Sequence, residues 1–111
     1  IDLIDVSSVS TLKRLSANYA GAEQVILGDN PNLTSVSLTS NNLVSLDVSG
    51  LPALTGIGLG NNDLTALDVT NNLALSALTV YGNPLTVLDL RNINIRTLNC
   101  TNTLIEFKVL I

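Results

Sequence analysis

A repeat of 21 residues is the feature that most constrains how this chain can fold. Leucines recur at this spacing at Leu12, Leu33, Leu54 and Leu75. A fixed period of roughly 20 to 50 residues is typical of stacked arrays, in which each repeat contacts only its neighbours. One repeat cannot bury its own apolar side chains, so several must stack to make a continuous core. The sequence therefore predicts a repeat solenoid.

Three central repeats are clear, and two weaker ones flank them. The clear repeats are residues 33–53, 54–74 and 75–94, the last being one residue shorter. Weaker copies cover residues 12–32 and run from Ile95 to the end, and residues 1–11 match the second half of a repeat. We expect a single domain, 1–111, of about five coils. Because the sequence starts partway through a repeat, we also expect a segment of a longer protein.

Each repeat divides into two halves with similar apolar patterns. The pairs Val36 with Leu38 and Leu46 with Val48 show the two-residue alternation of a short strand with one buried face. No window of ten residues has helical periodicity, and the one plausible helical turn lies around residues 12–17. The pattern predicts coils of short strands and turns, with strands on two sides and little or no helix.

An asparagine recurs at one position of the clear repeats, as Asn41, Asn62 and Asn83. Each follows the first apolar pair by three residues, where the chain must bend. A side-chain amide at a bend can bond backbone groups of the neighbouring coil, which would otherwise lack partners. We interpret these asparagines as structural residues.

The first half of each clear repeat resembles the signature LxxLxLxxNxL of the leucine-rich repeat family. The matches are Leu33-Val36-Leu38-Asn41-Leu43, Leu54-Ile57-Leu59-Asn62-Leu64 and Leu75-Leu78-Val80-Asn83-Leu85. The second half, LDVS or LDVT before a Gly/Asn turn, is similar to the short bacterial surface repeats of the family. The resemblance implies a right-handed, β-rich stack of coils. It weakens at the ends, where Ala17, Ala20, Ala22 and Thr103 replace signature residues.

The resemblance also implies that ligands bind the concave side, which the first-half strands line. The candidate face residues are Ser35, Ser37, Thr39, Thr79, Tyr81, Thr97, Asn99 and Thr101. Gly56, Gly58 and Gly60 continue this face in the middle repeat. Most of these side chains are small, so the face should be flat and poor in the aromatic and arginine anchors that dominate binding energies. Tyr81 is the exception, and we predict that it is the anchor.

A row of aspartates recurs in the second halves. Its members are Asp47, Asp68 and Asp89. Stacking should place them about 5 Å apart, and Asp5 joins the row if the first partial coil stacks in register. Like charges this close raise one another's pKa or recruit a cation, which suggests a weak cation-binding ladder. Alternatively, each carboxylate bonds to nearby amides or hydroxyls such as that of Ser49. Calcium needs about six to eight oxygens, and Ile26 interrupts the row.

Charge and hydropathy exclude two classes of partner. The chain has a formal net charge of −4 with five Lys and Arg residues. Nucleic-acid binding requires clustered cations to replace counterions, and no basic stripe forms here. No apolar run approaches the roughly 20 residues needed to cross a bilayer, so membrane insertion is not expected.

The residue inventory predicts no catalysis. The chain has no histidine, which removes the commonest general base and metal ligand. No Ser or Cys has a candidate base partner. The single cysteine, Cys100, aligns with Leu38 and Leu59, which predicts a small buried core residue with no nucleophilic role. We therefore expect no enzyme activity, no cofactor and no metal site.

The leading hypothesis is a non-catalytic recognition or adhesion module that binds a protein or glycan through the strand face. The alternatives are a structural spacer in a bacterial surface protein and weak cation binding by the aspartate row. Low Lys and Glu content, many Ser, Thr and Asn, and the resemblance favour a secreted or bacterial cell-surface location. The alternating segment Ile105 to Ile111 is predicted to be an adapted cap or an end-to-end contact with another chain or domain.

Overall fold

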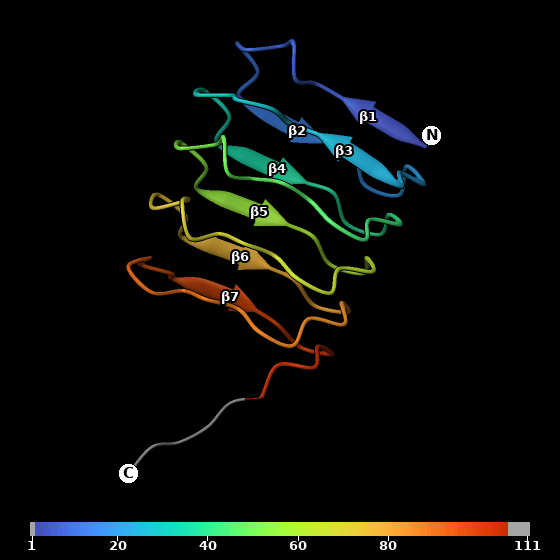
Figure 1. Cartoon of the computed structure of the whole chain (residues 1–111), viewed down its shortest axis with the longest axis vertical. Coiled ribbons are helices and arrows are strands. Elements are labelled where there is room, and N and C mark those ends of the chain that lie inside the picture. The colour runs from blue at the N-terminus through green and yellow to red at the C-terminus, as the bar shows by residue number, and fades with distance from the viewer. Residues whose placement is uncertain (1, 107–111) are drawn as a thin grey trace.

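The computed structural model describes residues 2–106, which wind into a β-solenoid of about five coils (Figure 1). These residues contain seven strands of three residues each and no helix. The strands are β1 (Leu3–Asp5), β2 (Arg14–Ser16), β3 (Gln24–Ile26), β4 (Ser35–Ser37), β5 (Gly56–Gly58), β6 (Ala77–Thr79) and β7 (Thr97–Asn99). The predicted β-rich stack of coils is therefore confirmed.

One side of the stack is a parallel five-stranded sheet in the order β2-β4-β5-β6-β7. The register advances by one repeat at each step, so that Ser35 pairs with Gly56 and Gly56 with Ala77. At the last step Ala77 pairs with Thr97, a separation of 20 residues (97 − 77) because the third clear repeat is one residue short. The sheet therefore keeps its alignment across the missing residue.

Among residues 2–106, the opposite side carries a ladder only in its first two coils, where β1 pairs with β3. In the later coils of the described chain, the equivalent segments form no strand. Residues 45–48 and 66–69 alternate between exposed and buried, whereas residues 87–90 are exposed or partly buried. The prediction of a strand on both sides of each coil is wrong for these coils. The ladder includes Ile26, a β-branched residue that favours strands, at the position that Asp47 and Asp68 occupy in later coils. Asp5 of β1 bonds to the amide two residues on just as these aspartates do, so that local bond does not explain the missing ladder.

The one segment where a helical turn was plausible, residues 12–17, forms no helical turn. Strand β2 occupies this segment and pairs with β4, with Leu15 opposite Val36. Isolated helical turns have little stability of their own, whereas the parallel ladder gives each backbone group of β2 that faces β4 a partner. Stacking therefore overrides the weak local helical pattern.

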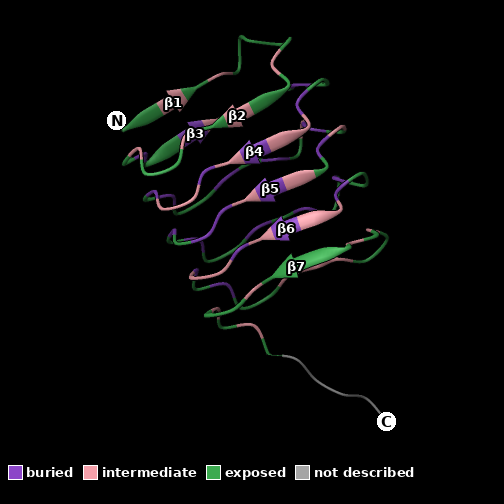
Figure 2. Ribbon diagram, turned by 180° about the vertical axis from the view of Figure 1, so that it is seen from behind, coloured by how far each residue is buried: buried purple, intermediate pink, exposed green. Residues whose placement is uncertain are grey.

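The core consists of apolar columns that run along the stack, with equivalent residues of successive coils in contact. Fully or almost fully buried members are Leu33, Leu38, Leu43, Leu54, Leu59, Leu64, Leu75, Leu78, Val80 and Leu85. Figure 2 shows that burial is concentrated in β3 to β6 and falls toward both ends. Ile4 and Leu15 near the start, and Leu90 and Cys100 near the end, are partly buried. Packing is complete only where a coil has neighbours on both sides.

A left-handed residue follows the first-half strand in successive coils. Tyr19, Ser40, Asn61 and Asn102 have φ between 53° and 58°, and Gly82 has φ 68° at the same position. Asparagine and glycine adopt this region at little cost, whereas tyrosine and serine are less suited to it. The repeated turn directs the chain out of the sheet at the same place in each coil.

Candidate functional site

The candidate strand face is assembled by the register of the parallel sheet. Ser37, Gly58, Thr79 and Asn99 lie side by side on β4 to β7. Ser35 and Thr97 lie on the neighbouring column of the same face, and Thr39, Tyr81 and Thr101 follow the strand ends. The structure therefore brings all eight candidate face residues to one side of the stack.

At one end of this face, Asn18 ties two coils together. Its Oδ1 accepts hydrogen bonds from the Ser37 hydroxyl at 2.9 Å and from the backbone N–H of Thr39 at 2.7 Å. Part of the polar surface is therefore committed to the fold.

At the other end, Asn99 and Thr101 form a local turn. The carboxamide oxygen of Asn99 accepts from the Thr101 hydroxyl at 2.9 Å and from the Thr101 N–H at 3.2 Å. The two residues are exposed, but their side chains are fixed by one another. The face is therefore a pre-ordered polar surface at both ends.

Tyr81 lies on the surface of the neighbouring coil. A Cβ atom added to Gly60 would collide with the ring of Tyr81, so the ring occupies the space that a side chain at position 60 would take. Tyr81 is therefore half-buried, and its hydroxyl makes no hydrogen bond to any described residue. The ring is held in place while its polar end remains available.

The middle of the face is bare. At Gly58 an added Cβ would meet only the hydroxyls of Ser37 and Thr39, both at 3.8 Å, and at Gly56 only the Cβ of Ala77 at 4.0 Å. These are ordinary contacts, so the glycines leave open surface. The face is consequently flat between Thr39 and Tyr81.

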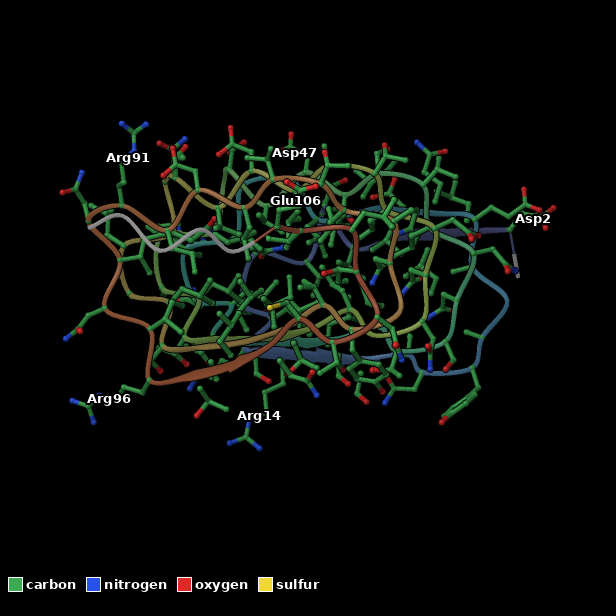
Figure 3. All side chains as sticks on the ribbon, turned by 90° about the horizontal axis from the view of Figure 1, so that it is seen from below. Asp2, Arg14, Asp47, Arg91, Arg96 and Glu106 are labelled. Atoms are coloured by element: carbon green, nitrogen blue, oxygen red, sulfur yellow. The ribbon has the colours of Figure 1, made fainter. Side chains whose placement is uncertain are left out.

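The aspartate row lies on the opposite side of the stack, as the label of Asp47 across from Arg14 shows in Figure 3. Asp5 is in register with Ile26, which interrupts the row. Each carboxylate is engaged in its own turn: Asp47 accepts from Ser49 and Asp68 from Thr70, with hydroxyl distances of 2.6 Å and amide distances of 2.9 Å. The row is therefore a series of local caps.

These hydrogen bonds set the acidity of the row. The hydroxyl and amide of Ser49 lower the pKa of Asp47, and those of Thr70 lower the pKa of Asp68. Repulsion from Asp89 and Asp47 raises the pKa of Asp68, but by less than the hydrogen bonds lower it. Of the two alternatives that the sequence left open for the row, the structure therefore fits the one in which each carboxylate bonds to nearby amides and hydroxyls.

Asp89 differs because Arg91 replaces the hydroxyl residue of the turn. The guanidinium donates from Nη2 to Oδ2 at 2.8 Å and from Nε to Oδ1 at 3.0 Å. These bonds lower the pKa of Asp89 to about 2. A shallow, open hollow lies beside this ion pair, bordered by Thr70 and Asn92. Within the described residues, no three His, Cys, Asp or Glu side chains converge as a metal site.

The recurring asparagines bridge consecutive coils. Asn62 accepts from Leu43 N–H at 3.1 Å and donates to the carbonyls of Leu38 and Leu59 at 2.9 and 3.0 Å. Asn41 and Asn83 make equivalent bonds to the coils that precede them. All three amides are buried, so each satisfies backbone groups that water cannot reach.

A second set of buried amides was not identified from the sequence. Asn30 and Asn72 are fully buried at a turn in the second half. Asn72 donates to the carbonyls of Val48 and Leu51 in the preceding coil, while Asn30 donates to Leu27. They occupy a position filled by Leu51 in the coil between them, so the column lacks a regular pattern. Because a leucine separates the two asparagines at this position, no periodic signal in the sequence marks them.

Cys100 lies in the core column of the last coil and is partly buried, with no other cysteine to pair with. Thr103, which stands where the other coils have Asn, donates from its hydroxyl to the Cys100 carbonyl at 2.7 Å. It reproduces the bond within the coil, but the short side chain makes no bond to the preceding coil. The stack is therefore less tightly tied at this end.

The fold and this surface define the class: a short β-solenoid with a flat strand face rich in hydroxyl and amide groups. No protein-family model matches the chain, and the searches of curated proteins and of solved structures found no match. Among the described residues, no helix has the length and apolar character needed to span a membrane.

Proposed function

We propose that this chain is a non-catalytic recognition module that binds a protein or glycan partner through the strand face. One observation carries the proposal: Tyr81 is seated on Gly60, with its hydroxyl free, beside a flat surface of Ser, Thr and Asn side chains. A fixed aromatic ring loses little conformational entropy on binding, and tyrosine is among the residues that anchor interfaces. We also infer membership of the leucine-rich repeat family and a secreted or bacterial-surface location.

A panel of extracellular proteins and a glycan array, probed with the labelled chain, test this proposal. Two variants should abolish any binding found: Tyr81→Ala, which removes the anchor, and Gly58→Gln, which places a long neutral side chain in the middle of the face. Val87→Ala is the control, because Val87 is 71% exposed on the second half of its coil. Binding that survives both face variants would show that the partner uses another surface.

A structural spacer is the second candidate function. The absence of side chains at Gly56 and Gly58, and the hydrogen bonds that occupy Ser37 and Asn99, favour it. If the chain is a spacer, we expect no specific ligand in either screen and the same screen results for Gly58→Gln as for the unmodified chain. The aspartate row gives the cation-binding hypothesis less support, because each carboxylate is already hydrogen-bonded in its own turn.

A further inference from the structure

The strand that ends the described sheet has a free edge. β7 is last in the sheet order, and all three of its residues are exposed. Its central residue, Leu98, is 40% exposed, whereas the equivalent Ile57 and Leu78 are 3% and 0% exposed. Strands β5 and β6 are each followed in the sheet by the strand of the next coil, whereas β7 has no following strand in the described chain.

The inner coils show which hydrogen bonds this edge can make. Leu59 N–H donates to Thr79 O, and Val80 N–H donates to Asn99 O, both at 2.8 Å. The equivalent donor of the last coil, Cys100 N–H, has no partner among the described residues. The edge therefore has an N–H group available at the position where each inner coil donates a hydrogen bond to the next coil.

The same edge offers an acceptor. Ser76 O receives the N–H groups of Arg96 and Thr97 at 2.8 and 3.0 Å. The equivalent carbonyl of the last coil belongs to Arg96 itself, and no described residue donates to it. Together, Cys100 N–H and Arg96 O fix both the direction and the register of a strand added parallel to β7.

The charge beside β7 indicates what kind of strand can bind its edge. All five cationic residues lie near the ends of the sequence, and none lies between residues 15 and 90; they are Lys13, Arg14, Arg91, Arg96 and Lys108. Arg96 borders β7 and projects from the stack on the same side as Arg14 (Figure 3). Within the described chain it forms no ion pair, since Arg91 alone is bound to a carboxylate. An acidic residue on an incoming strand would complement Arg96.

A second copy of this chain is the poorer fit. Its free edge in the same sheet is β2, at the opposite end of the order. In the repeat register, Lys13 occupies the position of Thr34, Thr55, Ser76 and Arg96. Stacking β2 on β7 would set Lys13 beside Arg96 at a strand spacing of about 4.8 Å. Charged residues on edge strands are a common protection against such pairing.

We propose that the free edge of β7 binds an extended polypeptide strand that runs parallel to β7 and carries an acidic residue beside Arg96. The strand adds one rung to the sheet: it accepts from Cys100 N–H, donates to Arg96 O, and covers Leu98 with an apolar side chain. Main-chain bonds supply affinity in this mode of recognition, and the side chains supply specificity.

The inner coils also provide the probe. Segment Leu75–Val80 already binds the preceding strand in this way, and its second residue, Ser76, holds the position beside Arg96. The probe is the labelled peptide Leu-Glu-Ala-Leu-Thr-Val. The matched control peptide, Leu-Lys-Ala-Leu-Thr-Val, differs only in the charge of its second residue. By fluorescence anisotropy with the full chain, the Glu peptide should bind about tenfold more tightly than the Lys peptide. The ratio should shrink in 1 M salt.

A charge exchange identifies the contact. Arg96→Glu should reverse the preference between the two peptides, while Arg91→Glu should leave it unchanged because Arg91 projects from the other side (Figure 3). Gly58→Gln blocks the strand face two strands away from β7 and should also leave peptide binding unchanged. The proposal therefore stands or falls independently of the recognition function assigned to Tyr81.

The register is tested with N-methylated peptides. In a parallel ladder, successive residues direct their N–H groups to alternate neighbours. Methylating the amide of the peptide's Ala or Thr should abolish binding, whereas methylating its second Leu should not. Equal affinity for the Glu and Lys peptides, equal effects of all methylations, or dimers of the unmodified chain in sedimentation that the peptide cannot displace would each overturn the proposal.

Discussion

Gly60 and Tyr81 form a pair in which the missing side chain of one makes room for the other. Because the ring occupies the position of a Cβ atom on Gly60, Gly60→Ala should displace it and destabilise the protein by about 1–3 kcal/mol. Gly58→Ala should change stability by less than about 0.5 kcal/mol, because the added Cβ atom would lie 3.8 Å from its nearest neighbours, the hydroxyls of Ser37 and Thr39. Urea unfolding of both variants measures the difference.

The Gly60 prediction also has an internal control. In a Tyr81→Ala background the ring is gone, so Gly60→Ala should then cost no more than Gly58→Ala. If the Gly60 substitution is equally harmful with and without the ring, the backbone at position 60 is responsible, and the pair is not coupled.

The asparagines between coils should be the most costly polar residues to remove. Asn62→Ala leaves Leu43 N–H without its buried side-chain partner. The carbonyls of Leu38 and Leu59 keep the bonds that Asn41 and Asn83 donate to them. An unsatisfied buried group costs about 1–3 kcal/mol, so we expect a loss of about 1–3 kcal/mol in the free energy of unfolding. Asp63→Ala, at the exposed neighbouring position, should lie within about 0.5 kcal/mol of the unmodified chain.

At the scale of the element, the second-half turns link stability to pH. The folded state lowers the pKa of Asp47, Asp68 and Asp89, with Asp89 at about 2. A carboxyl group with a depressed pKa stabilises the fold above its unfolded pKa, and that contribution is lost as pH falls through the folded value. Thermal unfolding midpoints should therefore be level near neutrality and fall from about pH 4 toward pH 2.

Thr70→Val tests the cause, because it removes the hydroxyl bond to Asp68 but keeps the amide bond and the shape of the side chain. It should flatten the acid side of the pH profile relative to the unmodified chain. Thr86→Val, at an exposed position in a second half where no hydrogen bond to aspartate forms, should leave the profile unchanged. An identical profile for all three proteins would contradict the assignment.

The sequence pattern predicts the first-half strands well and the second-half strands poorly. Both halves alternate apolar residues, and alternation reports which face is buried, but not whether a backbone finds a partner. The bonds that Asp47 and Asp68 accept from amides two residues on do not account for the difference, because Asp5 makes the same bond and still lies in β1. A local side-chain bond and a ladder coexist at Asp5, so only the three-dimensional arrangement shows where a ladder forms.

For the whole molecule, the repeat predicts the coil stack and the columns of the core, because each column is a periodic set of leucines. It also places the candidate face on one side. It does not predict that Tyr81 rests on Gly60, or that Asn30 and Asn72 are buried. These contacts depend on individual departures from the repeat, which carry no periodic signal.

Burial that declines toward both ends predicts a gradient of local stability. Val36, Ile57 and Leu78 are almost completely buried, whereas Ile4 and Leu98 are not. In a stack held together by nearest-neighbour contacts, terminal coils open with less free energy than inner ones. Native-state amide exchange should therefore be slowest in β4 to β6 and faster in β1 and β7. Uniform protection across all strands would show that the stack opens as one cooperative unit.

The missing residue in the third clear repeat has a practical consequence. The pairings of Ala77 with Thr97 and of Thr79 with Asn99 are intact. The turns between these strands therefore accommodate the shorter repeat without a change in the register of the sheet. Extending a loop costs little conformational entropy, roughly 0.6 kcal/mol for each doubling. The exposed turn around Arg91 and Asn92 is thus a natural point at which to graft a foreign peptide and display it from a rigid scaffold.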